Sequence, residues 1–221
     1  MADACRRSLR DPASVELVAV SKTFPAEAVR ELVEAGQKVF GESRQQEAEP
    51  KIGALPGSLC WHFIGHLQRN KVRRALPLFD VIHSIDSLRL ARQIEETAAE
   101  LGLFPQVYLE VNLAGEGSKR GLDPDALPQA ADELLGLRRL EILGLMAIPP
   151  VVDEPAAARP WFVKLRELRD RLAVRTGVPL AGLSMGMSGD YEVAIEEGAT
   201  VVRVGSALFG TRRFQDDVPQ A

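Results

Sequence analysis

The strongest constraint on the fold is a regular alternation of two kinds of segment along the chain. Between residues 15 and 210, short β-branched runs alternate with longer amphipathic runs. β-branched side chains favour strands, and apolar residues that recur every three to four positions favour helices. We therefore predict eight strands, at residues 15–21, 38–41, 61–64, 80–84, 106–112, 140–148, 180–184 and 200–205.

A helical segment is predicted after each strand. The first begins at Pro25, a residue suited to the first helical turn, and ends at Gly36. Further helical segments are predicted near 43–52, 68–78, 124–135 and 189–197. Two longer helices end at Gly102 and Gly177, and each carries an apolar stripe: Leu90, Ile94, Ala98 and Leu101 in the first, and Trp161, Leu165, Leu168 and Leu172 in the second.

Eight strand–helix units predict a single (β/α)8 TIM barrel. A doubly wound open sheet also alternates, but no G-x-G-x-x-G follows the first strand, and no linker or break in composition divides the units. We expect one domain over residues 1–221, with an ordered core at about 14–213 and loose termini at 1–13 and 214–221.

Composition excludes several classes of protein. The chain of 221 residues has 27 basic and 31 acidic residues, and this slight acidity disfavours a nucleic-acid binder or a polybasic membrane anchor. No apolar stretch approaches the roughly 20 residues that span a bilayer. The two cysteines and three histidines make a metal site a weak hypothesis. Free thiols and the absence of a targeting segment fit the cytoplasm.

Lys22 is the first candidate for chemistry. It is one of six lysines and directly follows the first predicted strand. In a barrel, the carboxyl end of a strand faces the mouth of the active site. Partial burial there lowers the pKa of an amine and makes it nucleophilic, which suits a Schiff base with a carbonyl compound. The alternative is a lysine that begins a loop and points to water.

Two loops near the C-terminus predict a phosphate site. Residues 184–190 are rich in Gly and Ser and lead into a helix, and Gly205 and Ser206 follow the last strand. Barrels commonly bind phosphate on the loops after strands seven and eight, where amides and hydroxyls can donate. Ordinary turns, with Ser188 as a helix cap, are the alternative.

Arg203 lies within the last predicted strand and needs a partner if it is buried. It could pair with a carboxylate across the barrel or point at a ligand. An amine at Lys22, a phosphate site and an inward arginine together suggest pyridoxal 5′-phosphate (PLP). Its aldehyde would join Lys22, its phosphate would bind the last two loops, and its pyridine nitrogen would face Arg203.

The chain also resembles the pyridoxal phosphate homeostasis protein family over about residues 11–212. The resemblance rests on residues 17–23 (LVAVSKT), 40–42 (FGE), 61–71 (WHFIGHLQRNK), 144–146 (GLM), 184–188 (SMGMS) and 203–206 (RVGS). It implies a PLP-binding barrel of the alanine-racemase N-terminal type, PLP fold type III. It also implies roles for Lys22 as the Schiff-base lysine, for Ser188, Gly205 and Ser206 at the phosphate, for Arg203 at the ring nitrogen, and for Ser184 and Met146 as pocket walls.

The sequence departs from the family at two places. The family often has F-G-E-N-Y, with the Asn near the cofactor, where this chain has Ser43 and Arg44 after Glu42. Ser43 is therefore expected at that side of the site. The family usually places a helix before the first strand, and about a dozen residues precede it here, so we expect reduced outer packing.

Three functions remain open at this point. The first is a protein that holds PLP and passes it to apo-PLP enzymes, acting as a monomer in PLP homeostasis. The second is a PLP-dependent, racemase-like enzyme, which needs a second acid or base such as His66 or Tyr108. The third is an aldolase that uses Lys22 without a cofactor. The barrel accounts for the whole chain and provides no second domain, which favours the first.

Overall fold

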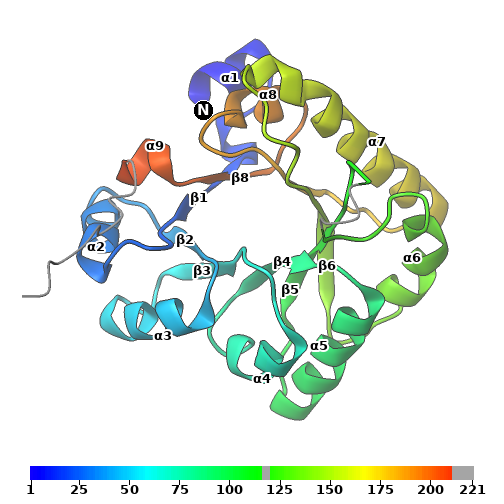
Figure 1. The fold of residues 1–221 in the computed structure, drawn as a ribbon, viewed down its shortest axis with the longest axis horizontal. Helices are drawn as coiled ribbons and strands as arrows, with labels where there is room; N and C mark the ends of the chain where they lie inside the picture. Colours follow the sequence, from blue (N-terminus) through cyan, green and yellow to red (C-terminus); the bar gives the residue numbers. More distant parts are fainter. Residues whose placement is uncertain (116–119, 211–221) are drawn as a thin grey trace, which may run out of the picture.

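The protein forms a closed barrel of eight parallel strands surrounded by helices (Figure 1). We describe it from a computed structural model, in which residues 1–115 and 120–210 are described. Each strand pairs with the next along the chain, and β1 pairs with β8 to close the barrel. The strands are β1 Glu16–Val20, β2 Val39–Glu42, β3 Cys60–Phe63, β4 Val81–Ile85, β5 Gln106–Glu110, β6 Glu141–Met146, β7 Gly182–Ser184 and β8 Val201–Val204. All eight predicted strands are thereby confirmed.

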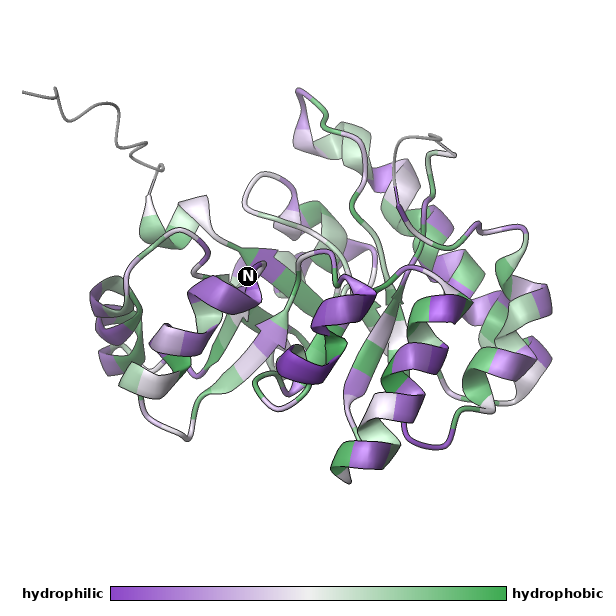
Figure 2. Ribbon diagram, turned by 60° about the horizontal axis from the view of Figure 1, so that its bottom comes forward, coloured by the Kyte–Doolittle hydropathy of each residue, from purple (hydrophilic) through white to green (hydrophobic). Residues whose placement is uncertain are grey.

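Helices cover the outside of the barrel. α1 Ala2–Arg7 precedes β1, and the α-helices after the successive strands are α2 Ala26–Glu34, α3 Gln45–Ala54, α4 Val72–Ala75, α5 Leu88–Leu101, α6 Leu127–Leu135, α7 Arg159–Thr176, α8 Tyr191–Glu196 and α9 Ser206–Phe209. Short 3-10 helices lie at Pro12–Ser14, Arg69–Lys71 and Pro155–Ala158. The apolar sides of the helices face the barrel and the polar sides face outward (Figure 2).

Two helices differ from their predicted form. The segment predicted at 68–78 is a 3-10 turn followed by the four-residue helix α4. In α7 the buried stripe runs through Phe162, Leu165, Leu168 and Leu172, whereas Trp161 is partly exposed with the Lys164 amine over its ring. The predicted stripe differs from the observed one only at its first residue. Trp161 and Phe162 both fit the helical spacing, and Phe162 is the one that faces the barrel.

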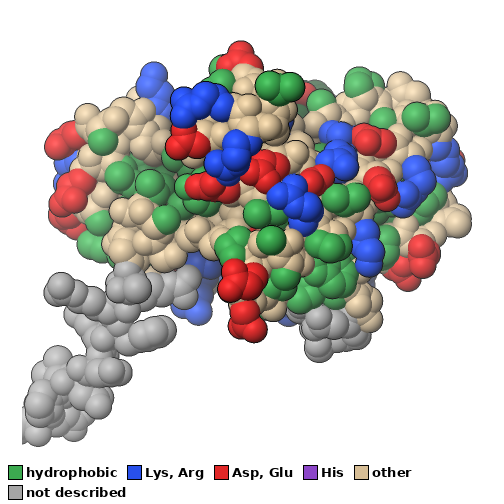
Figure 3. Space-filling view, turned by 90° about the horizontal axis from the view of Figure 1, so that it is seen from above, with side chains coloured by type: hydrophobic (Ala, Val, Ile, Leu, Met, Phe, Trp, Pro, Cys, Tyr) green, Lys and Arg blue, Asp and Glu red, His purple; other side chains and the backbone are tan. Residues whose placement is uncertain are grey.

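The N-terminal residues are not loose. In α1, Ala4 and Cys5 are fully buried, and the helix packs on α8. Arg7 pairs with Glu192 and Glu196, and Arg159 of α7 pairs with Glu196 as well. Figure 3 shows acidic and basic side chains interspersed over this side of the molecule. The expectation of reduced packing before β1 is therefore wrong, while residues 214–221 lie outside the described part of the chain.

The barrel has an outer and an inner core. The outer core lies between strands and helices, and the inner core contains Val18, Val81, Tyr108, Met146 and Val201. The inner layer also contains buried polar groups from β3, β4, β7 and β8: His62, His83, Ser184 and Arg203. Across the described residues, no helix combines the length and the apolar character needed to cross a membrane.

Candidate functional site

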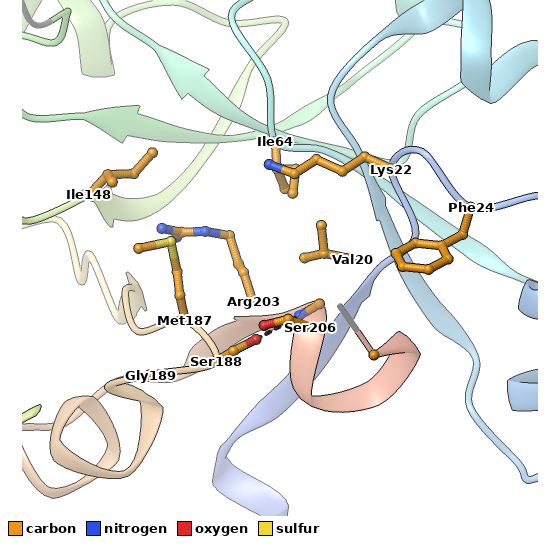
Figure 4. Close-up of a pocket in the computed structure, with 12 residues that line it drawn as sticks. Val20, Lys22, Phe24, Ile64, Ile148, Met187, Ser188, Gly189, Arg203 and Ser206 are labelled. Atoms are coloured by element: carbon orange, nitrogen blue, oxygen red, sulfur yellow. Dashed lines mark hydrogen bonds between the residues drawn. The ribbon is translucent and has the colours of Figure 1, made fainter. Parts of the chain in front are cut away.

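A pocket of about 400 Å³ opens at the carboxyl ends of the strands, where the first and last strands meet. Its volume is in the range usual for small-molecule sites. Its polar wall contains Lys22, Ser188, Arg203, Gly205 and Ser206, and its apolar wall contains Val20, Phe24, Ile64, Ile148 and Met187 (Figure 4). Five of the predicted site residues thus line one pocket.

Lys22 enters this pocket from the turn after β1. Its side chain is half-buried and extends across the pocket toward Ile64 (Figure 4). The next residue, Thr23, has a φ of 70°, an uncommon value for a β-branched residue. The chain therefore turns sharply after Lys22, and the lysine stays at the strand end while the following residues move away toward α2.

A buried polar cluster fixes the backbone just before Lys22. Ser21 Oγ donates to Glu42 Oε1 at 2.7 Å, and Lys51 Nζ donates to the same oxygen at 2.6 Å. Lys51 Nζ also donates to the Ser21 carbonyl oxygen at 2.9 Å. Burial raises the pKa of the Glu42 carboxyl, although the hydrogen bonds from Lys51 and Ser21 act in the opposite direction. The cluster joins β1, β2 and α3 behind the lysine.

The loops after β7 and β8 are joined through Ser188. Its Oγ accepts hydrogen bonds from the backbone N–H groups of Gly205 at 3.1 Å and Ala207 at 3.4 Å. Asp190 Oδ1 accepts the Met187 N–H at 2.6 Å, which holds the first loop. Ser188, Gly205 and Ser206 therefore gather at one side of the pocket. The Gly205 and Ala207 amides donate to Ser188 in this structure, and the two serine hydroxyls can donate to an anion.

Gly186 is required by the shape of the first loop. It has a φ of 94°, and a Cβ atom there would lie 2.5 Å from the Cβ of Ala194. A larger residue would therefore be strained in its backbone and would also clash with α8. This glycine brings Met187 and Ser188 to the pocket.

Arg203 is buried, and its guanidinium extends toward Met187 and Ile148 (Figure 4). Nη1 donates to the Ser184 carbonyl oxygen at 2.8 Å and also to Ser184 Oγ, and Nη2 donates to the Ala147 carbonyl oxygen at 3.1 Å. Among the described residues, no carboxylate lies within ion-pair distance of it. Burial lowers the pKa of Arg203 to about 10, so it remains a cation at neutral pH.

The other predicted site residues lie outside the pocket wall. Ser184 is fully buried and contacts Arg203 from behind. Met146 is buried in the inner core of the barrel. Ser43 follows β2, and its carbonyl oxygen would lie 2.1 Å from a Cβ atom at Gly65, so the loops after β2 and β3 touch there.

Neither candidate for a second acid or base lines the pocket. Tyr108 is buried in the barrel, with its ring centroid 4.7 Å from that of His83. His66 Nδ1 lies 3.3 Å from Asp86 Oδ2, in a separate depression on the rim with Gln68 and Asn70.

Sequence reasoning missed the apolar wall. Phe24 stacks on Phe209 with ring centroids 4.9 Å apart, and Ile64 and Ile148 complete the wall. Ile64 directly follows β3, and Ile148 lies two residues after β6. The rule that identified Lys22, that strand ends face the mouth, could have found these two residues as well.

The chain matches known proteins over nearly its whole length. The sequence model of the alanine racemase N-terminal domain matches residues 3–213. A pyridoxal phosphate homeostasis protein from Aquifex aeolicus is 46% identical over 212 residues, which cover 96% of this chain and 93% of that protein. A protein of the same name from Pseudomonas aeruginosa is 46% identical over 216 residues, covering 96% and 91% of the two chains.

Solved structures show the same barrel. PipY of Synechococcus elongatus, whose structure was determined with PLP bound, has a TM-score of 0.85 and 43% identity, with 94% of this chain and 97% of that chain covered. An alanine racemase of Clostridium difficile has a TM-score of 0.72 at 18% identity, and the match covers 97% of this chain but 56% of the racemase. The racemase likeness shows the fold alone.

Proposed function

Because the chain belongs to the pyridoxal phosphate homeostasis protein family, we propose that it binds PLP in the pocket between β1 and β8 and takes part in PLP homeostasis. The observation that carries the proposal is that an amine, a set of anion donors and a buried arginine line one pocket. Each of the three parts suits a different part of the PLP molecule.

The phosphate would bind the loops after β7 and β8. Ser188 and Ser206 provide hydroxyl donors at this side of the pocket, and the Gly205 amide, which donates to Ser188 in this structure, would turn to the phosphate. Lys22 and Arg203 place two cationic side chains in the same walls, and a dianionic ligand is attracted by positive charge in a partly buried site. The donor set and the charge therefore fit a phosphate ester.

Lys22 would hold the cofactor covalently. Its amine would condense with the aldehyde of PLP, forming a C=N bond and releasing water. Bound PLP supplies a reactive carbonyl carbon and an electron-accepting ring. The cluster of Ser21, Glu42 and Lys51 behind the strand end would hold the lysine backbone in place.

Arg203 would face the pyridine nitrogen. A guanidinium can donate hydrogen bonds but cannot accept them, so the ring nitrogen opposite it must be the acceptor and stay unprotonated. An unprotonated ring accepts electrons poorly, and this setting suits holding the cofactor better than carbanion chemistry.

A racemase-like activity is the second candidate, because the sequence model of the alanine racemase N-terminal domain matches residues 3–213. Racemisation needs acid–base groups on both sides of the substrate carbon, and Lys22 could provide one. Among the described residues, neither Tyr108 nor His66 lines the pocket, so no second group is in place. We therefore favour a carrier that acts as a monomer and passes PLP to apo forms of PLP-dependent enzymes.

The test is a transfer experiment. The purified protein is loaded with PLP, freed of unbound ligand and mixed with an apo-PLP enzyme whose activity reports arrival of the cofactor. We expect transfer together with no measurable racemisation of amino acids. Retention of PLP in the presence of the apo-enzyme, or turnover in the ordinary enzyme range of about 1–1000 per second, would overturn the carrier function.

A further inference from the structure

A line of buried polar side chains runs from Arg203 through the interior of the barrel. Ser184 Oγ lies 2.8 Å from His83 Nδ1, and His83 Nε2 lies 3.0 Å from His62 Nδ1. His62 Nε2 then lies 3.8 Å from Glu16 Oε1, too far for a hydrogen bond but near enough for attraction. Glu16 is the first residue of β1, so the line ends at the side of the barrel opposite the pocket.

The arginine end determines which atom of each pair donates. Arg203 is donor-only, so Ser184 Oγ accepts from it and has its own O–H to give. The partner for that O–H is His83 Nδ1, which must then be an unprotonated acceptor. A neutral His83 therefore carries its proton on Nε2 and donates it to His62 Nδ1. By the same reasoning, His62 carries its proton on Nε2.

The glutamate end requires the same direction. A proton on His62 Nε2 points an N–H group at the Glu16 carboxylate, which is favourable. The reverse order would point the Nε2 lone pair at that carboxylate. It would also make Ser184 Oγ accept from both Arg203 and His83, leaving its O–H without a partner among the described residues. A cation at one end and a carboxylate at the other thus select one proton order.

Burial keeps both imidazoles neutral. It lowers the pKa of His62 to about 4, against a smaller opposing effect of Asp80. It lowers the pKa of His83 well below the ordinary value, and the charge of Arg203 acts in the same direction, as a proton on His62 would. Tyr108, whose ring packs on His83, is itself held in its neutral form because burial raises its pKa to about 12.

We propose that Ser184, His83 and His62 form one proton-ordered hydrogen-bond chain between Arg203 and Glu16, and that the two histidines are positioning residues for the Arg203 guanidinium. The chain fixes Ser184 as an acceptor for Arg203, so two N–H groups of the arginine are committed to Ser184 and one to Ala147. The remaining N–H groups of its five keep one orientation relative to the pocket. The contact of these N–H groups with a ligand rests on the proposed function, whereas the proton order of the chain does not.

The first test uses the protein without cofactor. Nitrogen NMR of the imidazole side chains distinguishes protonated nitrogens from bare ones, and the chain has three histidines, so His66→Asn and His62→Phe assign the signals. At neutral pH we expect His62 and His83 to be neutral with the proton on Nε2. In Ser184→Ala, His83 loses the hydroxyl that donates to its Nδ1, so the tautomer with the proton on Nδ1 should appear. A proton on Nδ1 of either residue in the parent protein, or a charged imidazole, would overturn the proposal.

The second test asks whether the histidines position Arg203. The parent protein, His83→Phe and the control Tyr108→Phe are titrated with PLP and with an analogue whose ring nitrogen is replaced by C–H. We expect His83→Phe to weaken PLP about tenfold more than the analogue, since it disturbs a charged hydrogen bond that only PLP can make. Tyr108→Phe should leave the ratio of the two affinities unchanged.

The outcomes separate the two proposals. Equal weakening of both ligands by His83→Phe would show a purely structural role and would contradict the positioning role. Failure of the parent protein to bind PLP would remove the proposed function, while the tautomers in the cofactor-free protein would still decide the proton order. If His83→Phe does not fold, His62→Phe replaces it in the ligand comparison: a loss of affinity selective for PLP supports the positioning role, and equal weakening of both ligands contradicts it.

Discussion

Ser188 and Gly205 connect the two loops of the pocket directly, because Ser188 Oγ accepts the Gly205 N–H at 3.1 Å. The residue after Gly205 is Ser206, which lines the pocket at the start of α9. The two loops are therefore held together before any ligand arrives. A charged residue in place of Ser206 would change the charge of this side of the pocket without removing the Ser188–Gly205 hydrogen bond.

Ser206→Asp should separate phosphate recognition from ring recognition. A carboxylate at this position repels a phosphate, so PLP affinity should fall at least about tenfold more than pyridoxal affinity, or about 1.4 kcal/mol of selective loss. Titrations followed by absorbance measure both ligands, and Ser206→Ala is the control, with a smaller effect. Equal losses for the two ligands would place the phosphate elsewhere.

Lys22→Ala should abolish the covalent adduct with PLP. The lysine lies at the mouth of the barrel and contributes little to the core, so the variant should fold with a melting temperature close to that of the parent. Borohydride reduction followed by peptide mass mapping detects the adduct, and Lys71→Ala on the rim is the matched control. A reduced adduct on another lysine of the unmodified protein would contradict this assignment.

The buried histidines should make the protein less stable in mild acid. Unfolded His62 binds a proton below about pH 6.5, whereas the folded residue stays neutral down to about 4. The unfolded state therefore binds more protons in this window, and the free energy of unfolding falls as the pH is lowered through it. Above this window the full stability is present.

His62→Phe should remove part of that pH dependence. At the lower end of the window, proton uptake by one such histidine in the unfolded state lowers the free energy of unfolding by about 3 kcal/mol. Urea unfolding at several pH values can resolve this difference. Val81→Ala is the control, because Val81 faces His62 in the adjacent strand and has no titratable group. It should lower stability equally at every pH. If the free energy of unfolding of His62→Phe changed with pH in the same way as that of the parent, this imidazole would not titrate on unfolding.

Lys51→Met should destabilise the protein by about 3 kcal/mol, since it leaves the Glu42 carboxylate buried without its cation. Adding Glu42→Gln should recover part of the loss, because a neutral amide is cheaper to bury and can still accept from Ser21. Chemical unfolding of the two single variants and the double variant measures the coupling. Additive effects would mean that Lys51 and Glu42 contribute independently.

The fold could be predicted because the signals that specify it are local. Each strand is a short β-branched run, and residues such as Pro25 before α2 and Gly102 after α5 mark the end of a helix within a few residues. The N-terminal helix was missed for the opposite reason. Six residues give a weak periodic signal, and α1 is stabilised by packing of Ala4 and Cys5 against residues almost 200 positions away.

The pocket was partly predictable for a related reason. Lys22 and Ser206 follow strands, and parallel strands end on the same side of a barrel, so the topology alone brings them together. The partners of Arg203 could not be predicted. Ser184, His83 and His62 lie on three different strands, and their contacts depend on the register and on which side chains point inward.

The pocket lies at the seam where β1 meets β8, so its walls come from the two ends of the chain. Lys22 and Ser206 are separated by most of the chain, so a nascent polypeptide contains Lys22 long before it contains Arg203 and Ser206. Contacts of such long range form late because the chain entropy of closing the loop opposes them. A ligand held at this seam joins the first strand to the last, and its binding energy adds to the closure of the whole barrel.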